Sequence, residues 1–174
     1  MKTTFYIVLA FLLYGMTGCA QTKFTEGIST VNNQKFDIAR STMVFDGKKP
    51  WFIHPSKNKY NGPLPPPKDN YQFPMRRSEI HVDLEKVNTI VYRVLQEKKQ
   101  ALRNKNEKLG VSFKFETNGT LTDVNYTLSE DTIITLAEIE QIDTALRQGI
   151  KATFTGPSYT HYIAVDYSFP SISF

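Results

Sequence analysis

Apolar residues follow the helical period over a long stretch in the middle of the chain. From Leu84 to Leu102 they recur on what would be one face of a helix. Asp83 stands just before this stretch, where a short acidic side chain often caps a helix. The pattern predicts one helix over residues 84–106, preceded by a brief strand over residues 79–82.

Strict alternation of apolar and polar residues replaces the helical period further along. Residues 111–115 and 121–128 both alternate, as half-buried strands do. Asn118-Gly119 lies between them and is a strong signal for a two-residue hairpin turn. These residues therefore predict an antiparallel hairpin.

A second helix and a last strand complete the C-terminal half. Thr135 and Glu138 have the spacing of a capping box, which predicts a helix from there to Gly149. Residues 162–169 alternate again and predict the last strand. The order helix, strand, strand, helix, strand indicates an α+β fold, in which two helices cover one face of a small antiparallel sheet.

The first half of the chain gives weaker signals. Residues 35–38 and 41–45 have strand character and lead to a turn at Asp46-Gly47. The short apolar run 51–53 is expected to pair back across that turn. We therefore treat residues 31–174 as one α+β domain, made of a strand and strap part, 31–77, and an αββαβ core, 78–174.

Residues 50–74 hold seven of the nine prolines together with several aromatic residues. Two interpretations are open. Trp51, Tyr60 and Tyr71 are candidate ligand contacts if the segment is an exposed platform that stacks against a glycan or a peptide. Alternatively, the segment is an irregular strap whose aromatic side chains pack onto the domain, since large exposed apolar patches are uncommon in monomers.

The N-terminus has the pattern of an export signal. Lys2 precedes the apolar run 5–14, and Cys19, the only cysteine, follows small residues in Met16-Thr17-Gly18-Cys19. This run resembles the lipobox of bacterial lipoproteins. The resemblance implies that residues 1–18 are removed, that Cys19 carries fatty acids such as palmitate, and that residues 19–30 form a polar tether.

In that family the residue after the cysteine influences sorting. Here that residue is Ala20 rather than aspartate, which in this family is associated with sorting to the outer membrane. It does not indicate whether the protein faces the periplasm or the cell surface. The membrane is then a partner through the N-terminal lipid. The chain as a whole also resembles small, functionally uncharacterised lipoproteins of Gram-negative gut bacteria.

The hairpin, the second helix and the last strand together resemble the C-terminal domain of TonB. The matching runs are 111–115, 118–124, 136–147 and 162–169, about half of the chain. TonB itself has an uncleaved transmembrane anchor and a long spacer rich in proline, lysine and glutamate. This chain has a lipobox and a short strap instead, so energy transduction is not expected.

Charge adds little to the functional picture. Removal of Lys2 with the signal lowers the formal charge from +4 to +3, too small to indicate nucleic-acid binding. Basic residues gather near the end of the first predicted helix, where cations oppose the helix dipole; a membrane or polyanion patch is the alternative. They are Lys98, Lys99, Arg103, Lys105 and Lys108.

No motif for nucleotide binding, zinc proteases or serine hydrolases occurs in the chain. His54, His81 and His161 stand in separate segments, so we assign no catalytic residue, metal site or cofactor. The leading interpretation is a non-enzymatic envelope lipoprotein that binds a protein partner or an envelope component, with the strand 162–169 as the expected open edge. Glycan or peptide capture by residues 50–74 is the alternative, and a hydrolase or metalloprotein using His81 and His161 is third.

Overall fold

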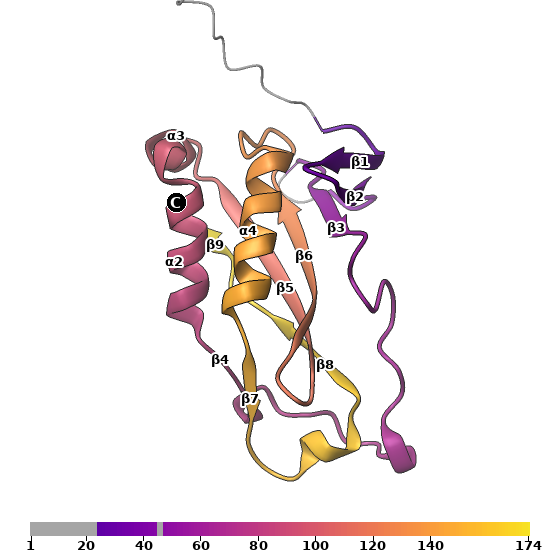
Figure 1. Cartoon of the computed structure of the whole chain (residues 1–174). Helices are drawn as coiled ribbons and strands as arrows, with labels where there is room; N and C mark the ends of the chain where they lie inside the picture. The colour runs from indigo at the N-terminus through magenta and orange to yellow at the C-terminus, as the bar shows by residue number, and fades with distance from the viewer. Residues whose placement is uncertain (1–23, 45–46) are drawn as a thin grey trace, which may run out of the picture.

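The structure is a computed structural model that describes residues 24–44 and 47–174. Its main feature is an antiparallel sheet with the strand order β1-β2-β3-β6-β5-β8, in which β9 extends the line of β8 beside β5 (Figure 1). The strands are β1 (Gly27–Val31), β2 (Gln34–Arg40), β3 (Trp51–Pro55), β5 (Lys108–Glu116), β6 (Leu121–Leu128), β8 (Ala164–Ser168) and β9 (Ile172–Ser173).

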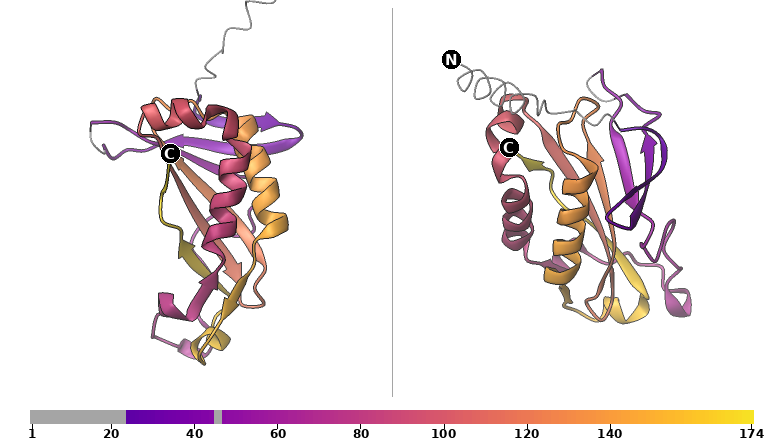
Figure 2. Two further views of the ribbon diagram at one scale, coloured as in Figure 1. Left: turned by 90° about the vertical axis from the view of Figure 1, so that its left-hand side faces the viewer. Right: turned by 45° about the horizontal axis from the view of Figure 1, so that its top comes forward.

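Two helices lie side by side on one face of this sheet, so the expected α+β class is confirmed (Figure 2). The α-helices are α2 (Leu84–Val94), α3 (Lys99–Asn104) and α4 (Leu136–Gly149), of which α2 and α4 cover the sheet. A separate two-stranded sheet joins β4 (Ile80–Val82) to β7 (Ala152–Phe154). Short 3-10 turns are η1 (Lys68–Asn70), η2 (Arg77–Glu79), η3 (Gln96–Lys98) and η4 (Ser158–His161). No described helix has the length and apolar character needed to span a membrane.

The hydrophobic core fills the space between the sheet and the two helices. Alternate residues of β5 point toward the helices, and Phe113 and Phe115 are 1% and 0% exposed. Val87 and Val91 from α2, and Ile142 from α4, are likewise buried on the opposite side of this layer. Each such side chain contributes about 1.5–3 kcal/mol through burial.

The expected single helix over residues 84–106 is interrupted. It breaks at Leu95, passes through η3 and resumes as α3, which lies across the end of the sheet (Figure 2). The break keeps Leu95 and Leu102 at 1% and 0% exposure. It also lets Lys98 donate to the carbonyl oxygen of Ile133, which lies 2.9 Å from its Nζ atom. Tertiary packing therefore overrides the local helical pattern.

The N-terminal strands differ from the expected ones. β1 begins at Gly27, so the expected tether over residues 19–30 does not extend beyond residue 26. Asn32 and Asn33, with φ of 48° and 64°, form the two-residue turn to β2. The pairing of 51–53 with the preceding strand is confirmed, whereas residues 41–44 form no strand. Asp46, in the expected turn, lies outside the described residues.

The β5–β6 hairpin has a longer turn than Asn118-Gly119 predicted. The Gly119 N–H donates to Glu116 O at 2.8 Å, and the Glu116 N–H donates to Thr120 O at 2.9 Å. Gly119 has a φ of +90°, whereas Asn118 is not in the left-handed region. This is the geometry of a three-residue loop with a bulge at glycine, rather than a two-residue turn.

Gly119→Ala should destabilise the protein by at least about 1–2 kcal/mol, the cost of left-handed backbone for an L-residue. The added Cβ atom would also collide with the carbonyl oxygen of Ala152. Urea unfolding measures the change. Gly62→Ala is the matched control, because nothing lies within 4 Å of its new Cβ atom and its φ is not left-handed. Equal midpoints for the two variants would contradict this account of the turn.

Candidate functional site

The segment expected to form a strap, residues 50–74, begins with β3, Trp51–Pro55. We keep the name strap for residues 56–76, which pack across the sheet on the face away from the helices. The N–H groups of Lys59 and Tyr60 donate to the Asp123 carboxylate of β6, at 2.8 and 2.9 Å. On the next strand, β5, Lys114 donates from Nζ to the carbonyl oxygen of Tyr60, at 2.8 Å. The strap thus passes from β6 over β5 toward the β8 edge, and from there the chain reaches α2.

The three candidate contacts of this segment do not form one platform. Trp51 is 5% exposed in β3, where its Nε1 donates to Glu130 O at 3.2 Å and its ring lies 6.0 Å from that of Phe24. Tyr60 is half-buried over β5. Tyr71 lies further along the strap, against the segment before β8. Trp51 therefore offers no face to a ligand.

Asn58 replaces a strand partner where β3 ends. Its side-chain amide donates to Val124 O and accepts from Val124 N–H, both at 3.1 Å, as a neighbouring strand backbone would. Arg147 of α4 donates to the same amide oxygen. Asn58 is 6% exposed, so these bonds satisfy polar groups that would otherwise be buried without partners.

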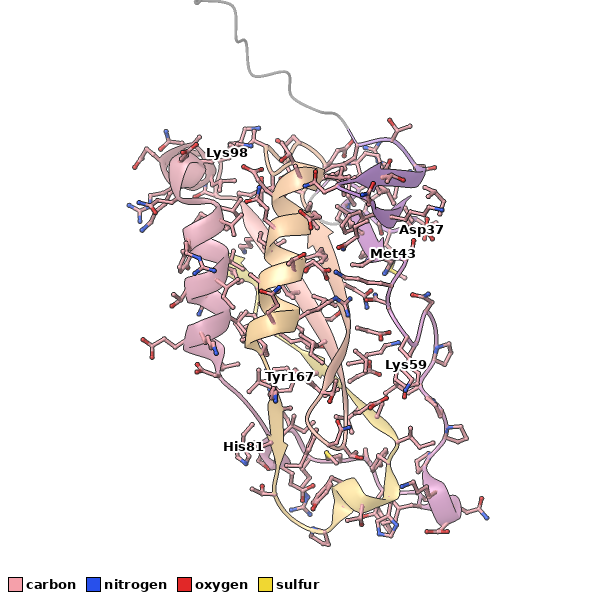
Figure 3. All side chains as sticks on the ribbon, viewed as in Figure 1. Asp37, Met43, Lys59, His81, Lys98 and Tyr167 are labelled. Atoms are coloured by element: carbon pink, nitrogen blue, oxygen red, sulfur yellow. The ribbon has the colours of Figure 1, made fainter. Side chains whose placement is uncertain are left out.

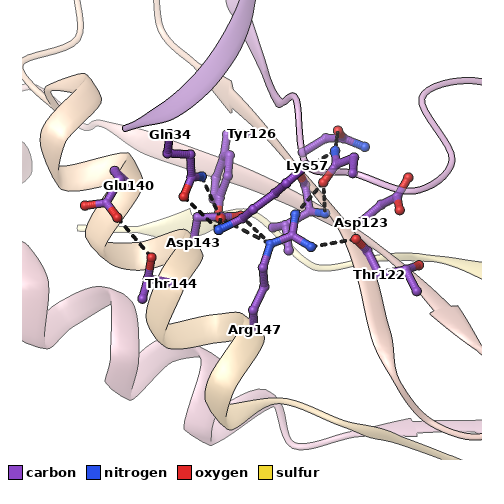
Figure 4. A network of polar contacts seen from close by, with 12 residues as sticks. Gln34, Lys57, Thr122, Asp123, Tyr126, Glu140, Asp143, Thr144 and Arg147 are labelled. Carbon is purple, nitrogen blue, oxygen red and sulfur yellow. Dashed lines mark hydrogen bonds and ion pairs between the residues drawn. The ribbon is translucent and has the colours of Figure 1, made fainter. Parts of the chain in front are cut away.

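Asp143 of α4 is the centre of a buried polar network (Figure 4). Its carboxylate is 0% exposed and accepts from Gln34 Nε2 at 2.9 Å and Tyr126 Oη at 3.2 Å. Arg147 Nε lies 3.1 Å and Lys57 Nζ 2.6 Å from the same carboxylate. Burial, reinforced by the nearby negative charge, raises the pKa of Tyr126, which stays protonated and donates. The network joins β2, the strap and α4, and both oxygen atoms of the Asp143 carboxylate accept hydrogen bonds.

A second group of side chains gathers where the strap meets the residues before β8. We call Tyr71, Phe73, His161 and Tyr162 the distal aromatic cluster. Tyr71 stacks on His161 with ring centroids 4.1 Å apart and planes 2° apart, and it meets Phe73 and Tyr162 edge to face. Tyr162 also donates from Oη to Phe73 O. Phe73 is nevertheless 70% exposed.

Sequence reasoning did not find this cluster. The aromatic residues of the strap indicated a possible contact site. No sequence pattern near Tyr71 or His161, however, indicates that these two residues, ninety positions apart, stack on each other. The closing contact comes from η4, a short turn with no pattern of its own. Only Tyr71 of the expected contacts belongs to the cluster.

The three histidines have separate surroundings. His54 Nδ1 lies 2.9 Å from Asn125 Oδ1, and His81 Nε2 lies 3.1 Å from Thr155 Oγ1. His161 is in the distal aromatic cluster instead. Within residues 24–44 and 47–174, no group of three or more histidine, cysteine, aspartate or glutamate residues is placed to hold a metal ion.

β8 is the last full strand of the sheet, so the expected edge position of this strand is confirmed. Its outer side is partly closed. Arg77 donates to Ser168 O at 2.8 Å and lies over the Tyr167 ring, and Ala164 is 1% exposed. Asp166 of the same strand is exposed and adds a charge to this edge strand. Such features block addition of another strand.

Comparisons with known proteins give a fold but no activity. No protein-family model and no curated protein matches the sequence. The structure is similar to the crystal structure of a DUF5043 family protein from Bacteroides uniformis, with a TM-score of 0.61 and 14% identity over 84% of this chain and 85% of the other. At this identity the likeness shows a shared fold alone.

Proposed function

We propose that the protein is a lipid-anchored, non-enzymatic module of the outer membrane that binds a protein partner through the distal aromatic cluster. The lipobox resemblance at Cys19 supports the anchor, and the TonB-like order of β5, β6, α4 and β8 supports a periplasmic binding domain. One observation carries the binding role. Phe73 is 70% exposed and yet is held in place by its neighbours.

A fixed, exposed aromatic ring is a typical anchor for a protein interface. Tyr71 packs against the Phe73 ring at 5.8 Å, and Tyr162 donates to the backbone carbonyl oxygen of Phe73, so part of the freedom of this residue is already lost before binding. Burial of such a ring in a partner's pocket commonly dominates the binding energy.

The same geometry favours a protein over a glycan. Sugars stack on the free face of an aromatic ring, but His161 covers one face of Tyr71 in parallel contact. Tyr162 packs against Tyr71 edge to face at 6.0 Å, and Trp51 is buried elsewhere. Phe73 remains, an apolar ring without a hydroxyl group. Because Arg77 and Asp166 obstruct β8, we place the contact at the cluster rather than along that edge.

A photo-reactive phenylalanine analogue at position 73 should cross-link in cell membranes to one envelope protein. Position 43 is the matched control, since Met43 is 67% exposed but lies in a different part of the domain. Phe73→Ser should weaken capture of the identified protein about tenfold or more, as for an interface hot spot, and leave the melting temperature unchanged.

Adducts to the same protein at both positions, or no protein adduct at position 73, would contradict the proposed surface. An adduct to polysaccharide at position 73 would favour the glycan alternative.

A further inference from the structure

The end of the domain where the described chain begins carries exposed apolar side chains. We call this the proximal end; it comprises β1, residues 41–44 and α3. Ile28, Met43 and Val44 are 66%, 67% and 58% exposed. Ile28 pairs with the exposed Asp37, so it lies on the sheet face away from the helices. None of these side chains contributes to the core.

The break between α2 and α3 brings cations to the same end. Figure 1 shows α3 and β1 together at one end of the molecule, with η4 and the far part of the strap, including η1, at the other. Lys98 and Met43 both lie in the upper half of Figure 3. Arg103 and Lys108 are exposed and form no ion pair with another described residue.

Acidic side chains at the proximal end are partly neutralised. Within the described part of the chain, Lys48 pairs with Asp131 and Lys98 with Glu138. Lys48 also holds the pKa of Asp131 below its usual range, which keeps this pair charged. Glu26, Asp37 and Glu97 are exposed and form no ion pair with another described residue, but five cations without an ion pair outnumber these three carboxylates. The cations are Lys49, Lys99, Arg103, Lys105 and Lys108.

The chain between the lipid and the domain is short. Phe24 already packs against Trp51, with ring centroids 6.0 Å apart. Five residue steps from Cys19 to Phe24 span at most about 18 Å even when fully extended. An acylated Cys19 therefore holds the proximal end close to the headgroups.

We infer that the proximal end is a membrane-contact surface, with Ile28, Met43 and Val44 in the interfacial layer and the α3 cations over anionic headgroups. The inference rests on the lipid anchor of the proposed function. Amphipathic surfaces with basic and apolar residues bind membranes in this way, and a lipid chain adds to them. Membrane contact through the proximal end would also orient the distal aromatic cluster away from the bilayer, where a partner protein can reach it.

Single-cysteine labelling tests the orientation, because acylation leaves the mature chain without a free thiol. Met43→Cys and Phe73→Cys, at sites of nearly equal exposure, are labelled with a fluorophore in the lipidated protein. The protein is then placed in phosphatidylglycerol–phosphatidylcholine vesicles that contain lipid-attached quenchers. We expect at least fivefold stronger quenching at position 43 than at position 73.

Two results overturn the inference in different ways. A chain that floats with the vesicles but shows equal quenching at both positions refutes the orientation alone. A chain that does not float refutes the anchor as well.

The charged part of the surface has its own test. Arg103→Glu combined with Lys108→Glu should reduce quenching at position 43 at least twofold in the same vesicles. Unchanged quenching would show that Arg103 and Lys108 do not contribute to the membrane contact. Vesicles of phosphatidylcholine alone supply the control, since there the double variant should match the parent.

Discussion

Asp143→Ala should lower the free energy of unfolding by about 3–5 kcal/mol, the usual effect of removing one partner from a buried ion pair. The carboxylate is 0% exposed and balances Arg147 and Lys57. Its loss leaves the Arg147 charge largely buried and the Tyr126 hydroxyl without an acceptor. Urea unfolding followed by far-UV circular dichroism measures the change.

Glu140→Ala on the same helix is the matched control. Glu140 bonds to Asn32 and Thr144, at 3.2 and 3.0 Å, near the surface, so its removal should cost less than about 1 kcal/mol. Asp143→Asn is the substitute variant if Asp143→Ala does not fold. It keeps the size of the side chain, so its loss of unfolding free energy should be smaller than that expected for Asp143→Ala and larger than that for Glu140→Ala. Equal losses for Asp143→Ala and Glu140→Ala would show that the network does not join the strap to α4.

Local signals in the sequence predicted the C-terminal core well. The Asp83 side chain accepts from Lys86 N–H at 2.8 Å, and Thr135 and Glu138 form the expected capping box. These contacts lie within one helical turn, so spacing alone identifies them. β6 has the expected bounds because alternation over Leu121–Leu128 reflects its two different faces.

Longer-range contacts could not be predicted in this way. Asn58 and Val124 are 66 positions apart, and Gln34 and Asp143 are 109 apart, so nothing near either residue signals the pairing. Trp51 illustrates a choice that the sequence left open. Its aromatic, proline-rich neighbourhood allowed either an exposed platform or a packed strap, and its inward position in β3 places it among the buried residues. Composition did not indicate which face of the strand it occupies.

β1 was missed for a further reason. Its residues, Gly27–Val31, carry little apolar character, and its turn is Asn-Asn rather than Asn-Gly. The strand forms because β2 supplies a full line of backbone partners, from Ile38 to Gln34. Backbone pairing with a neighbouring strand depends on the sheet as a whole, so it requires little apolar alternation in the sequence of β1 itself.

Cys19→Ala should abolish palmitate incorporation and leave an uncleaved or mislocalised precursor with a folded domain. In the family that the lipobox resembles, the thiol receives the first lipid and cleavage follows. Cys19 precedes the described residues, and the core begins with Phe24 against Trp51, so the substitution removes no core contact. Radiolabelled palmitate and membrane fractionation compare the variant with the parent.

Thr22→Ala is the control for this experiment, because it changes the tether outside the Met16-Thr17-Gly18-Cys19 run. It should keep the label and the membrane location. Equal labelling of Cys19→Ala and the parent, or a parent found in the soluble periplasmic fraction, would refute the anchor. Loss of label with an uncleaved variant on membranes would agree with the prediction, because the precursor keeps the apolar run 5–14.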